Sequence, residues 1–348
     1  MGLAAAPNVE LAIDGTPVPD NHFLSFTIDR DFNQPDMAAI ILANQGDVYS
    51  TKKIGAPLEV KVGDPPTAIF TGEIVGLEPT YRGGEKTKIV IRAMNRMHRL
   101  LRGKKSVTFT DKTDSDILKQ VTSAAGLTLD FTHEKSLSYK HVYQHNQTDL
   151  EFALFRAGRI GCNVWCVGQK LFVKQPKLTD DQPIVLNVDD SSDNAQMRGL
   201  KIRLSSASVV KKVTVKGWNP ETKELITGEA SVGKSALGKV SGVDASGTLG
   251  SEETFNVDTP IWSNEEATVL AKARLQDLSL GFMTGTAELT GNANVELGKT
   301  VAITANAAGK DDPFNGNYLV VGISHHHTTG GFETVLRLAR DSQGNPKG

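Results

Sequence analysis

Short stretches in which apolar and polar residues alternate recur along most of this 348-residue chain, separated by clusters of Gly, Pro, Asn and Asp. Alternation with a period of two is typical of half-buried strands, and turn-forming clusters at this spacing are typical of barrels and sandwiches. In the first hundred residues the alternating or apolar segments are 9–13, 23–28, 37–43, 58–62, 69–77 and 88–93. They predict a small tube-like β-barrel over residues 1–103.

Three segments carry helix signals instead. Thr113, Thr148 and Ser263 each stand three positions before an acidic residue, which is the pattern of a capping box. The glycines expected to end these helices in the left-handed conformation are Gly126, Gly161 and Gly281. The first two helices, together with a hairpin at 163–173, predict a compact α+β module over residues 104–178.

Residues 179–348 return to strand patterns at 183–188 and 199–218 and are predicted to form a second tube-like β-barrel. Residues 219–260 differ, because the stretch 228–250 is rich in Gly, Ser, Ala and Lys and has little periodicity. We expect an irregular insertion there, either a long loop or an irregular hairpin outside the barrel cores. The polar C-terminal tail is expected to be loose. The predicted fold class is therefore mainly β with α+β parts: two tube-like β-barrel domains and an inserted small α+β module.

A faint internal repeat links the two predicted barrels. Residues 55–93 contain a leading glycine, the motif Ile-Val-Gly ending at Gly76, a Gly-Gly pair and an alternating strand. Residues 298–339 contain the same order of features, with Val-Val-Gly ending at Gly322. Hairpins with glycine turns arise by chance, but the matched order and spacing favour two related β domains.

The composition excludes several classes of protein. Lys and Arg total 38 against 40 Asp and Glu, a net charge of −2, which gives no overall attraction to nucleic acid or anionic lipid. The longest apolar run, 37–43, is far shorter than the about 20 residues that span a bilayer, and residues 1–7 lack the regions of a secretory signal. Two cysteines are too few for a disulfide framework. We expect a soluble protein of a reducing cytoplasm, with no nucleic-acid specificity and no membrane insertion.

Residues 228–235 match the pattern G-x-x-x-x-G-K-[ST] of a phosphate-binding loop. In such a loop the lysine, here Lys234, reaches the phosphates and the hydroxyl, here Ser235, holds magnesium, between a strand and a helix. Glycines at positions 238, 242 and 247 disfavour the required helix. A P-loop nucleotide hydrolase is therefore an alternative function that the sequence disfavours.

Two further motifs are candidates for metal or redox chemistry. In a strand, His325 and His327 face one side and His326 the other, so at most two ligands converge, and we interpret the three as polar residues near an exposed hairpin turn. Cys162 and Cys166 have no second Cys/His pair downstream and are interpreted as core residues.

Two charged segments complete the candidates. The acidic segment 189–193 lacks the glycine and the terminal glutamate of an EF-hand loop, and we interpret it as a solvated loop. A basic run with no interleaved aromatic residues is interpreted as a solvated helix and its rim rather than a nucleic-acid site. Its residues are Arg92, Arg96, Arg99, Arg102, Lys104 and Lys105. The sequence predicts no catalytic residue, no cofactor-binding residue and no metal ligand, and therefore no enzyme.

Several segments resemble the phage late control protein D family, which comprises tail hubs of contractile phages and related injection systems and the hub portion of VgrG-like proteins. In chain order these segments are 70–79, 91–103, 113–118, 125–127, 144–161, 162–173, 318–325 and 331–334. The strongest is 144–161, which resembles a helix of the family, with Ala153 where the family usually has Leu. The stretch 228–250 carries no family pattern.

The resemblance implies a structural hub protein, without a cofactor, that links the six-fold tail tube to the three-fold spike of a contractile phage tail or phage-derived injection system. We expect a homotrimer, because two barrels in each of three chains give a ring of pseudo-six-fold symmetry. The ring is expected to be hollow, so that tape-measure protein or cargo can pass. A stand-alone cell-wall or carbohydrate-binding module is the remaining alternative.

The resemblance also implies the neighbours of such a hub. A tail tube protein or tube initiator lies above it and baseplate wedge or LysM-like proteins lie around it. Because the chain stops at residue 348, the spike below is expected to be a separate protein. The implied location is the baseplate of a virion or injection particle, assembled in the bacterial cytoplasm.

Overall fold

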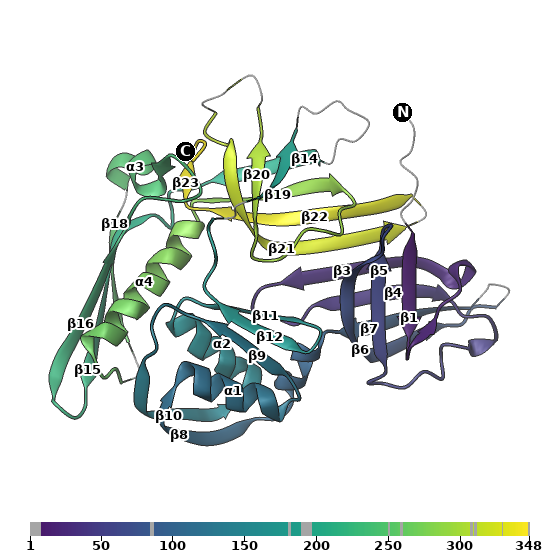
Figure 1. Ribbon diagram of the computed structural model, residues 1–348, viewed down its shortest axis with the longest axis horizontal. Helices are drawn as coiled ribbons and strands as arrows, with labels where there is room; N and C mark the ends of the chain where they lie inside the picture. The colour runs from purple at the N-terminus through teal and green to yellow at the C-terminus, as the bar shows by residue number, and fades with distance from the viewer. Residues whose placement is uncertain are drawn as a thin grey trace.

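The computed structural model describes residues 8–83, 87–179, 182–188, 197–249, 251–257, 260–306, 309, 312–328 and 330–346. Their elements form four groups, which Figure 1 separates as two strand groups along the top and right, a module at the bottom and a sheet with one long helix at the left. The acidic segment 189–193 lies outside the described residues.

The first strand group holds the N-terminal strands. They are β1 (Val9–Ile13), β2 (Thr16–Pro17), β3 (Phe23–Asp31), β4 (Met37–Ala43), β5 (Pro57–Val62), β6 (Thr67–Thr80) and β7 (Lys88–Met94), with short 3-10 helices at Asp20–His22, Gln45–Asp47 and Arg96–Leu101. All six strand segments predicted in this region are confirmed. Their inward residues, among them Phe26, Ile40 and Ile91, form one hydrophobic cluster.

The second strand group comes from the C-terminal half. Its strands are β13 (Ile184–Asn187), β14 (Met197–Leu204), β19 (Met283–Thr290), β20 (Thr300–Thr304), β21 (Gly316–Thr328) and β22 (Gly331–Arg340). They cover a second hydrophobic cluster that includes Tyr318, Ile323 and Leu336.

The two strand groups belong to one 13-stranded sheet. Its main path runs β14-β19-β22-β21-β3-β4-β7-β6-β5-β1-β2, with β20 and β13 attached at β21. The connection is the antiparallel pair β3–β21, in which residues 26–31 lie opposite residues 322–327. The prediction of a mainly β fold with α+β parts is confirmed, and the structure adds that the strands assigned to separate barrels are hydrogen-bonded to each other.

The internal repeat is visible in the backbone. Strands β5–β6–β7 and β20–β21–β22 are both antiparallel meanders, and the second and third strands of each share a register shift at the motif glycine, between Ile74 and Gly76 and between Val320 and Gly322. The leading glycines also correspond, since Gly55 N donates to Ile74 O at 2.7 Å and residue 298 donates to Val320 O at 2.9 Å. Both leading glycines have positive φ, 88° and 82°. A shared bulge and a shared hydrogen bond support the interpretation of the repeat as two related units.

The module between the strand groups contains two helices and five strands. They are β8 (Lys105–Thr113), α1 (Asp114–Ala124), β9 (Thr128–Thr132), β10 (Ser138–Gln147), α2 (Asp149–Arg159), β11 (Asn163–Val167) and β12 (Lys170–Lys174). Both predicted capping boxes are present, with Thr113 and Thr148 as N-caps. The helices pack on a third hydrophobic cluster that contains Phe109, Phe152 and both cysteines.

Of the three glycines predicted to end helices in the left-handed conformation, two adopt it and one does not. Gly126 and Gly161 have φ of 71° and 67°, so they adopt the predicted left-handed conformation. Gly281 does not, because its φ is −76°. A Cβ there would lie 2.7 Å from Ser208 Oγ, and rotation of the Ser208 side chain would relieve this contact.

Of the alternatives for residues 219–260, a hairpin is present and lies in a hydrophobic cluster of its own, but the expectation that it is irregular is wrong. Strand β15 (Val210–Asn219) pairs with β16 (Glu224–Ser231) on one side and with β18 (Ser251–Asn256) on the other, and α4 (Asn264–Leu280) packs against them in a fourth hydrophobic cluster. The small residues that looked irregular permit this packing. A Cβ on Gly228 would overlap the backbone of Ala267 in α4, so only glycine lets the strand lie so close to the helix.

The expectation of a loose tail is also wrong for the described residues up to 346. Strand β23 (Ser342–Gln343) pairs with β17 (Val240–Ser241), next to α3 (Gly242–Ser246) and a 3-10 turn at Gly247–Leu249. The fully buried Arg340 holds this region, because its guanidinium donates to the carbonyls of Asn315, Leu237 and Gly344 and lies over the ring of Tyr318.

Candidate functional site

The 13-stranded sheet has one face on the hydrophobic clusters and one open face. Side chains alternate between the faces of a sheet, so the pairing register assigns them. Rows of the open face cross the junction between the strand groups. One row is Arg92, Ala39, Thr27, His326 and Glu333, on β7, β4, β3, β21 and β22. The second row is Asp29, Ser324, Val335 and Glu288. The third row is Asp31, Gly322, Arg337, Thr286 and Lys201. We call these three rows the open face.

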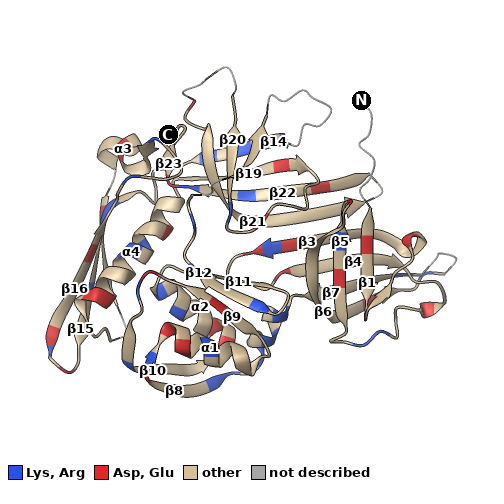
Figure 2. Ribbon diagram, viewed as in Figure 1, with Lys and Arg blue, Asp and Glu red and all other residues tan. Residues whose placement is uncertain are grey.

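Both arginines of the open face have acidic partners. Arg92 Nε donates to Glu78 Oε1 of β6 at 2.7 Å, and that hydrogen bond lowers the pKa of the Glu78 carboxyl. Arg337 on β22 forms an ion pair with Asp31 on β3. Figure 2 shows both acidic and basic residues on β3 and β22. The open face therefore presents mixed charge, with small aliphatic residues such as Ala39 between the charges, rather than a field of one sign.

The internal repeat places an arginine at equivalent positions of the open face. Arg92 lies opposite Gly76, and Arg337 lies opposite Gly322. A Cβ on Gly76 would meet Arg92 Cβ at 3.6 Å, and one on Gly322 would overlap the Arg337 guanidinium. Gly322 thus leaves room for the guanidinium of Arg337, whereas at Gly76 a Cβ would make only an ordinary contact with Arg92.

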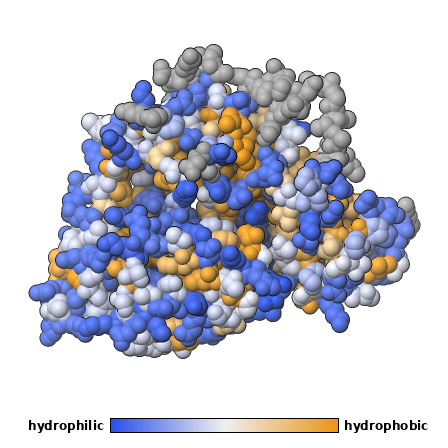
Figure 3. Space-filling model, viewed as in Figure 1, coloured by the Kyte–Doolittle hydropathy of each residue, from blue (hydrophilic) through white to orange (hydrophobic). Residues whose placement is uncertain are grey.

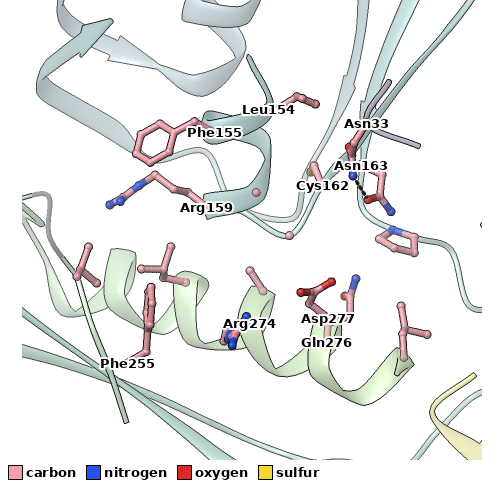
Figure 4. A pocket seen from close by; sticks show the side chains of 17 residues that line it. Asn33, Leu154, Phe155, Arg159, Cys162, Asn163, Phe255, Arg274, Gln276 and Asp277 are labelled. Carbon is pink, nitrogen blue, oxygen red and sulfur yellow. Dashed lines mark hydrogen bonds between the residues drawn. The ribbon is translucent and has the colours of Figure 1, made fainter. Parts of the chain in front are cut away.

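A second candidate is a groove between the module and helix α4. A cavity of about 560 Å³ opens between α2 of the module, α4 and β18. Phe155 and Arg159 line it from α2, and Phe255, Arg274 and Asp277 line it from β18 and α4 (Figure 4). We call it the α2–α4 groove.

Buried ion pairs hold the walls of the α2–α4 groove. Arg159 Nη2 donates to Glu266 Oε1 of α4 at 2.7 Å, with both side chains buried, and Glu266 also accepts from the Trp262 backbone N–H. One turn earlier, Arg156 Nε donates to Asp114 Oδ1 at 2.7 Å.

The contact between α2 and α4 is close as well as charged. A Cβ on Gly161 would lie 3.1 Å from Ala273 Cβ of α4. Because breaking a buried pair leaves an uncompensated charge, the Arg159–Glu266 pair and this close packing fix α2 against α4, whereas the Arg156–Asp114 pair fixes α2 against α1.

The phosphate-loop match lies in a different structure. Residues 228–231 belong to β16 and pack on α4, Lys234 is exposed, and Ser235 Oγ donates to Asp341 near the C-terminus. A loop that wraps phosphate needs successive free backbone amides before a helix. Here the first half of the motif is engaged in a strand ladder, so the residues do not form such a site.

The three histidines approach an exposed hairpin turn, as predicted, since Thr328 and Gly330 are exposed, but two of the histidines are themselves buried. His325 is fully buried and His327 is 9% exposed, and both rings contact Phe332 on β22. Burial lowers the pKa of both, that of His325 to about 3. His326 faces the open side, where Nδ1 lies 3.3 Å from Thr27 Oγ1. The alternation was predicted correctly, but the aromatic packing that buries one side was not.

The interpretation of the cysteines as core residues is confirmed. Cys162 and Cys166 are buried, and burial raises the pKa of each thiol to about 12.

The interpretation of the basic run as a solvated helix and its rim is confirmed for the exposed Arg92, Arg102, Lys104 and Lys105, but it is wrong for the 3-10 helix itself. The buried carboxylate of Glu73 in β6 is contacted by the side chains of Arg96, His98 and Arg99. Burial opposes ionisation of Glu73, but hydrogen bonds from Arg99 and His98 outweigh it and lower its pKa. Elsewhere in the run Lys105 Nζ donates to Asp149 Oδ2 at 2.6 Å. Arg99 Nη1 also donates to the carbonyl of Ala125 in the module at 3.2 Å, so this arginine links the first strand group to the module.

Within the described ranges, no three His, Cys, Asp or Glu side chains lie close enough together to hold a metal ion. Among the same residues, no helix is both long and apolar enough to cross a bilayer. On the face in Figure 3, hydrophilic surface predominates and the hydrophobic areas are small and separate.

Solved structures with the same fold cover nearly the whole chain. The tail protein of Neisseria meningitidis MC58 is 14% identical, with a TM-score of 0.73 over 97% of both chains. The 43 kDa tail protein of prophage MuSo2 from Shewanella oneidensis is also 14% identical, with a TM-score of 0.72 over 97% of this chain and all of that one. The E. coli c3393 protein, a component of the type VI secretion system, is 12% identical, with a TM-score of 0.63 over 97% of this chain and 77% of that one.

The predicted resemblance to phage tail hubs and VgrG-like proteins is thus confirmed at the level of the fold. A comparison with curated proteins finds no match. The family model described as the Alg8 N-terminal domain matches residues 4–329, and the chain therefore belongs to that family.

Proposed function

We propose that this chain is a structural, non-enzymatic hub protein of a contractile phage tail or a phage-derived injection system. The observation that carries the proposal is the internal repeat: two meanders with the same bulge and the same leading-glycine hydrogen bond lie in one chain whose fold is that of phage tail proteins. A chain with two such units can match a six-fold tube to a three-fold spike.

We propose a homotrimer with pseudo-six-fold symmetry. The main path of the 13-stranded sheet ends at β14 and at β1–β2, and an unpaired strand edge is a ready template for the strand of a neighbouring copy. When one edge of each copy pairs with the other edge of the next, the copies form a closed ring if the rotation from one copy to the next divides a full turn evenly. Three chains would then present six related strand units around one axis.

In this arrangement the open face lines the channel. Its charged and polar side chains support the proposal, because a wall without a large apolar patch does not retain the tape-measure protein or cargo that passes it. Residues 104–178 would form an α+β domain outside the ring, between barrel domains at 1–103 and 179–348. The proposed neighbours are a tube protein above, a spike protein below and baseplate proteins around the module, in a particle assembled in the bacterial cytoplasm.

The test is the copy number and symmetry of the hub. Sedimentation of the purified full chain is expected to give a species of three times the 37.4 kDa chain mass. Electron cryomicroscopy of the assembled particle is expected to show three copies in one ring. A single copy or six copies per ring in the particle would refute the proposal.

A further inference from the structure

The α2–α4 groove has the features of a preformed site for an apolar side chain. Its volume of about 560 Å³ falls in the range of about 300–1,000 Å³ that is typical of ligand pockets. Phe155 on α2 is 42% exposed and Phe255 on β18 is 40% exposed, and they lie on opposite walls (Figure 4). Covering two exposed aromatic rings with an apolar group is favourable, because it removes their surface from water.

Gly158 keeps the groove open on the α2 side. It lies in the helix, is exposed and lines the cavity, and a Cβ placed on it would have no other atom within 4 Å. Any larger side chain at this position would occupy space that is now free.

The charged residues of the groove leave one carboxylate available. Arg159 is paired with Glu266, and Arg274 Nε donates to Glu253 Oε1 at 2.9 Å. Asp277 is exposed and has no ion pair with any of the described residues. The groove therefore combines an apolar cavity with one acidic group at its rim, which complements a cation beside an apolar anchor.

We infer that the α2–α4 groove binds a segment of another protein that inserts an aromatic or large aliphatic side chain between Phe155 and Phe255 and places a lysine or arginine beside Asp277. The fixed position of α2 against α4 supports this inference, because a groove whose walls are already ordered loses little conformational entropy when a ligand binds. The groove is separate from the open face, so this inference and the proposed hub can fail independently.

The probe is the fluorescein-labelled peptide Gly-Ser-Trp-Ser-Lys-Ser-Gly, titrated with the full-length chain and followed by fluorescence anisotropy. Two matched peptides replace the tryptophan by serine or the lysine by glutamate. We expect the first peptide to bind at least about tenfold more tightly than either control, because one control lacks the tryptophan anchor and the other lacks the lysine. A tenfold difference in Kd corresponds to about 1.4 kcal/mol of binding free energy. Equal binding of the three peptides, or no binding of any, would overturn the inference.

Substitutions in the groove test the location. Gly158→Leu is expected to weaken binding at least about tenfold by filling the cavity, and it replaces glycine in a helix by a better helix former. Gly233→Leu is the matched control, because a Cβ on this exposed glycine also has no atom within 4 Å, and it should bind like the unchanged chain. Asp277→Lys should reverse the preference, so that the glutamate peptide binds more tightly than the lysine peptide. Binding that survives Gly158→Leu, or an unchanged preference in Asp277→Lys, would refute the assignment.

Two other occupants have distinct outcomes. If N-acetyl-tryptophanamide competes as strongly as the whole peptide, the cavity takes a small aromatic ligand and the inferred protein segment is wrong. If Gly158→Leu abolishes self-association in sedimentation, the occupant is a second copy of this chain and the inferred partner is wrong.

Discussion

The hydroxyl of Ser324 donates to the carboxylate of Asp29 across 2.6 Å, although 295 residues separate the two in sequence. Ser324 is on β21 and Asp29 on β3, directly opposite each other in the antiparallel pair that joins the two strand groups. Asp31, two residues after Asp29 on β3, forms an ion pair with Arg337 of β22. The hydrogen bond and the ion pair are both side-chain contacts across the junction, on the open face. The junction that makes one sheet of the two repeats is therefore secured by side chains as well as by the backbone ladder.

The first prediction concerns this contact. Asp29→Ala and Ser324→Ala should each lower the free energy of unfolding, and a double-mutant cycle should give a coupling energy of about 1 kcal/mol, the usual net value of one hydrogen bond. Urea denaturation of the four chains measures it. Pairing Asp29→Ala with Ser231→Ala, at an exposed strand serine in another sheet, should give additive losses. A coupling of zero between residues 29 and 324 would contradict the contact.

The second prediction concerns the ion pair between α2 and α4. Arg159→Met should lower the free energy of unfolding by about 3–5 kcal/mol, because the buried carboxylate of Glu266 loses its cation. Adding Glu266→Gln should recover most of this loss, since it removes the uncompensated charge and keeps an acceptor for the Trp262 backbone N–H. Thermal or urea denaturation measures both.

A matched exposed pair provides the control. Lys140 and Glu221 are joined at 2.6 Å, but their side chains are 62% and 54% exposed. Lys140→Ala should therefore cost less than about 1 kcal/mol. If Arg159→Met lowers the free energy of unfolding by as little as Lys140→Ala does, the Arg159–Glu266 pair does not hold α2 and α4 together.

Local signals made the helices and most strands predictable. A capping box lies within four residues, so Thr113 and Thr148 could be assigned from the sequence alone, and the structure contains both boxes. The alternation of His325 to His327 was equally local. What buries two of these rings is Phe332, which comes from the next strand, and the sequence does not show which face it covers.

Tertiary partners and close packing were not predictable. The basic run looked solvated because its acceptor, Glu73, lies 26 residues before Arg99 and reaches it only through the fold. The stretch 228–250 looked irregular because small residues have weak strand preference, yet at Gly228 the missing side chain is what allows contact with α4. The α2–α4 groove combines residues from α2, β11, β18 and α4 with residues between elements, and it has no sequence signature.

The third prediction concerns pH. Burial lowers the pKa of His325 from 6.5 to about 3, so between these values the unfolded chain binds a proton that the folded chain does not. The free energy of unfolding should therefore fall as pH decreases from about 6.5 toward 3, by up to about 1.4 kcal/mol per pH unit from this residue. His325→Phe keeps a ring beside Phe332 and should remove that part of the slope, as measured by urea denaturation at pH 4.5, 5.5 and 7.

The control for this prediction is His145→Phe, at an exposed position, which should leave the pH dependence unchanged. Buried Asp36 acts in the opposite direction, because burial raises its pKa to about 6 and its contribution to stability falls as pH increases from 3.8 toward 6. That contribution is common to all three chains and cancels in the comparison. A His325→Phe profile parallel to that of the unchanged chain would contradict the prediction.

The fourth prediction concerns the thiols. Burial raises the pKa of Cys162 and Cys166 to about 12, and both side chains lie in the hydrophobic cluster of the module. Because the thiolate is the reactive form, the folded chain at pH 8 should react with Ellman's reagent at least about a hundredfold more slowly than the chain unfolded in guanidinium, which should release two equivalents. Cys162→Ser and Cys166→Ser should each reduce the unfolded-state signal to one equivalent and identify any thiol that reacts early. Rapid labelling of either thiol in the folded chain would show that the module opens, and that its core does not shield the sulfur atoms.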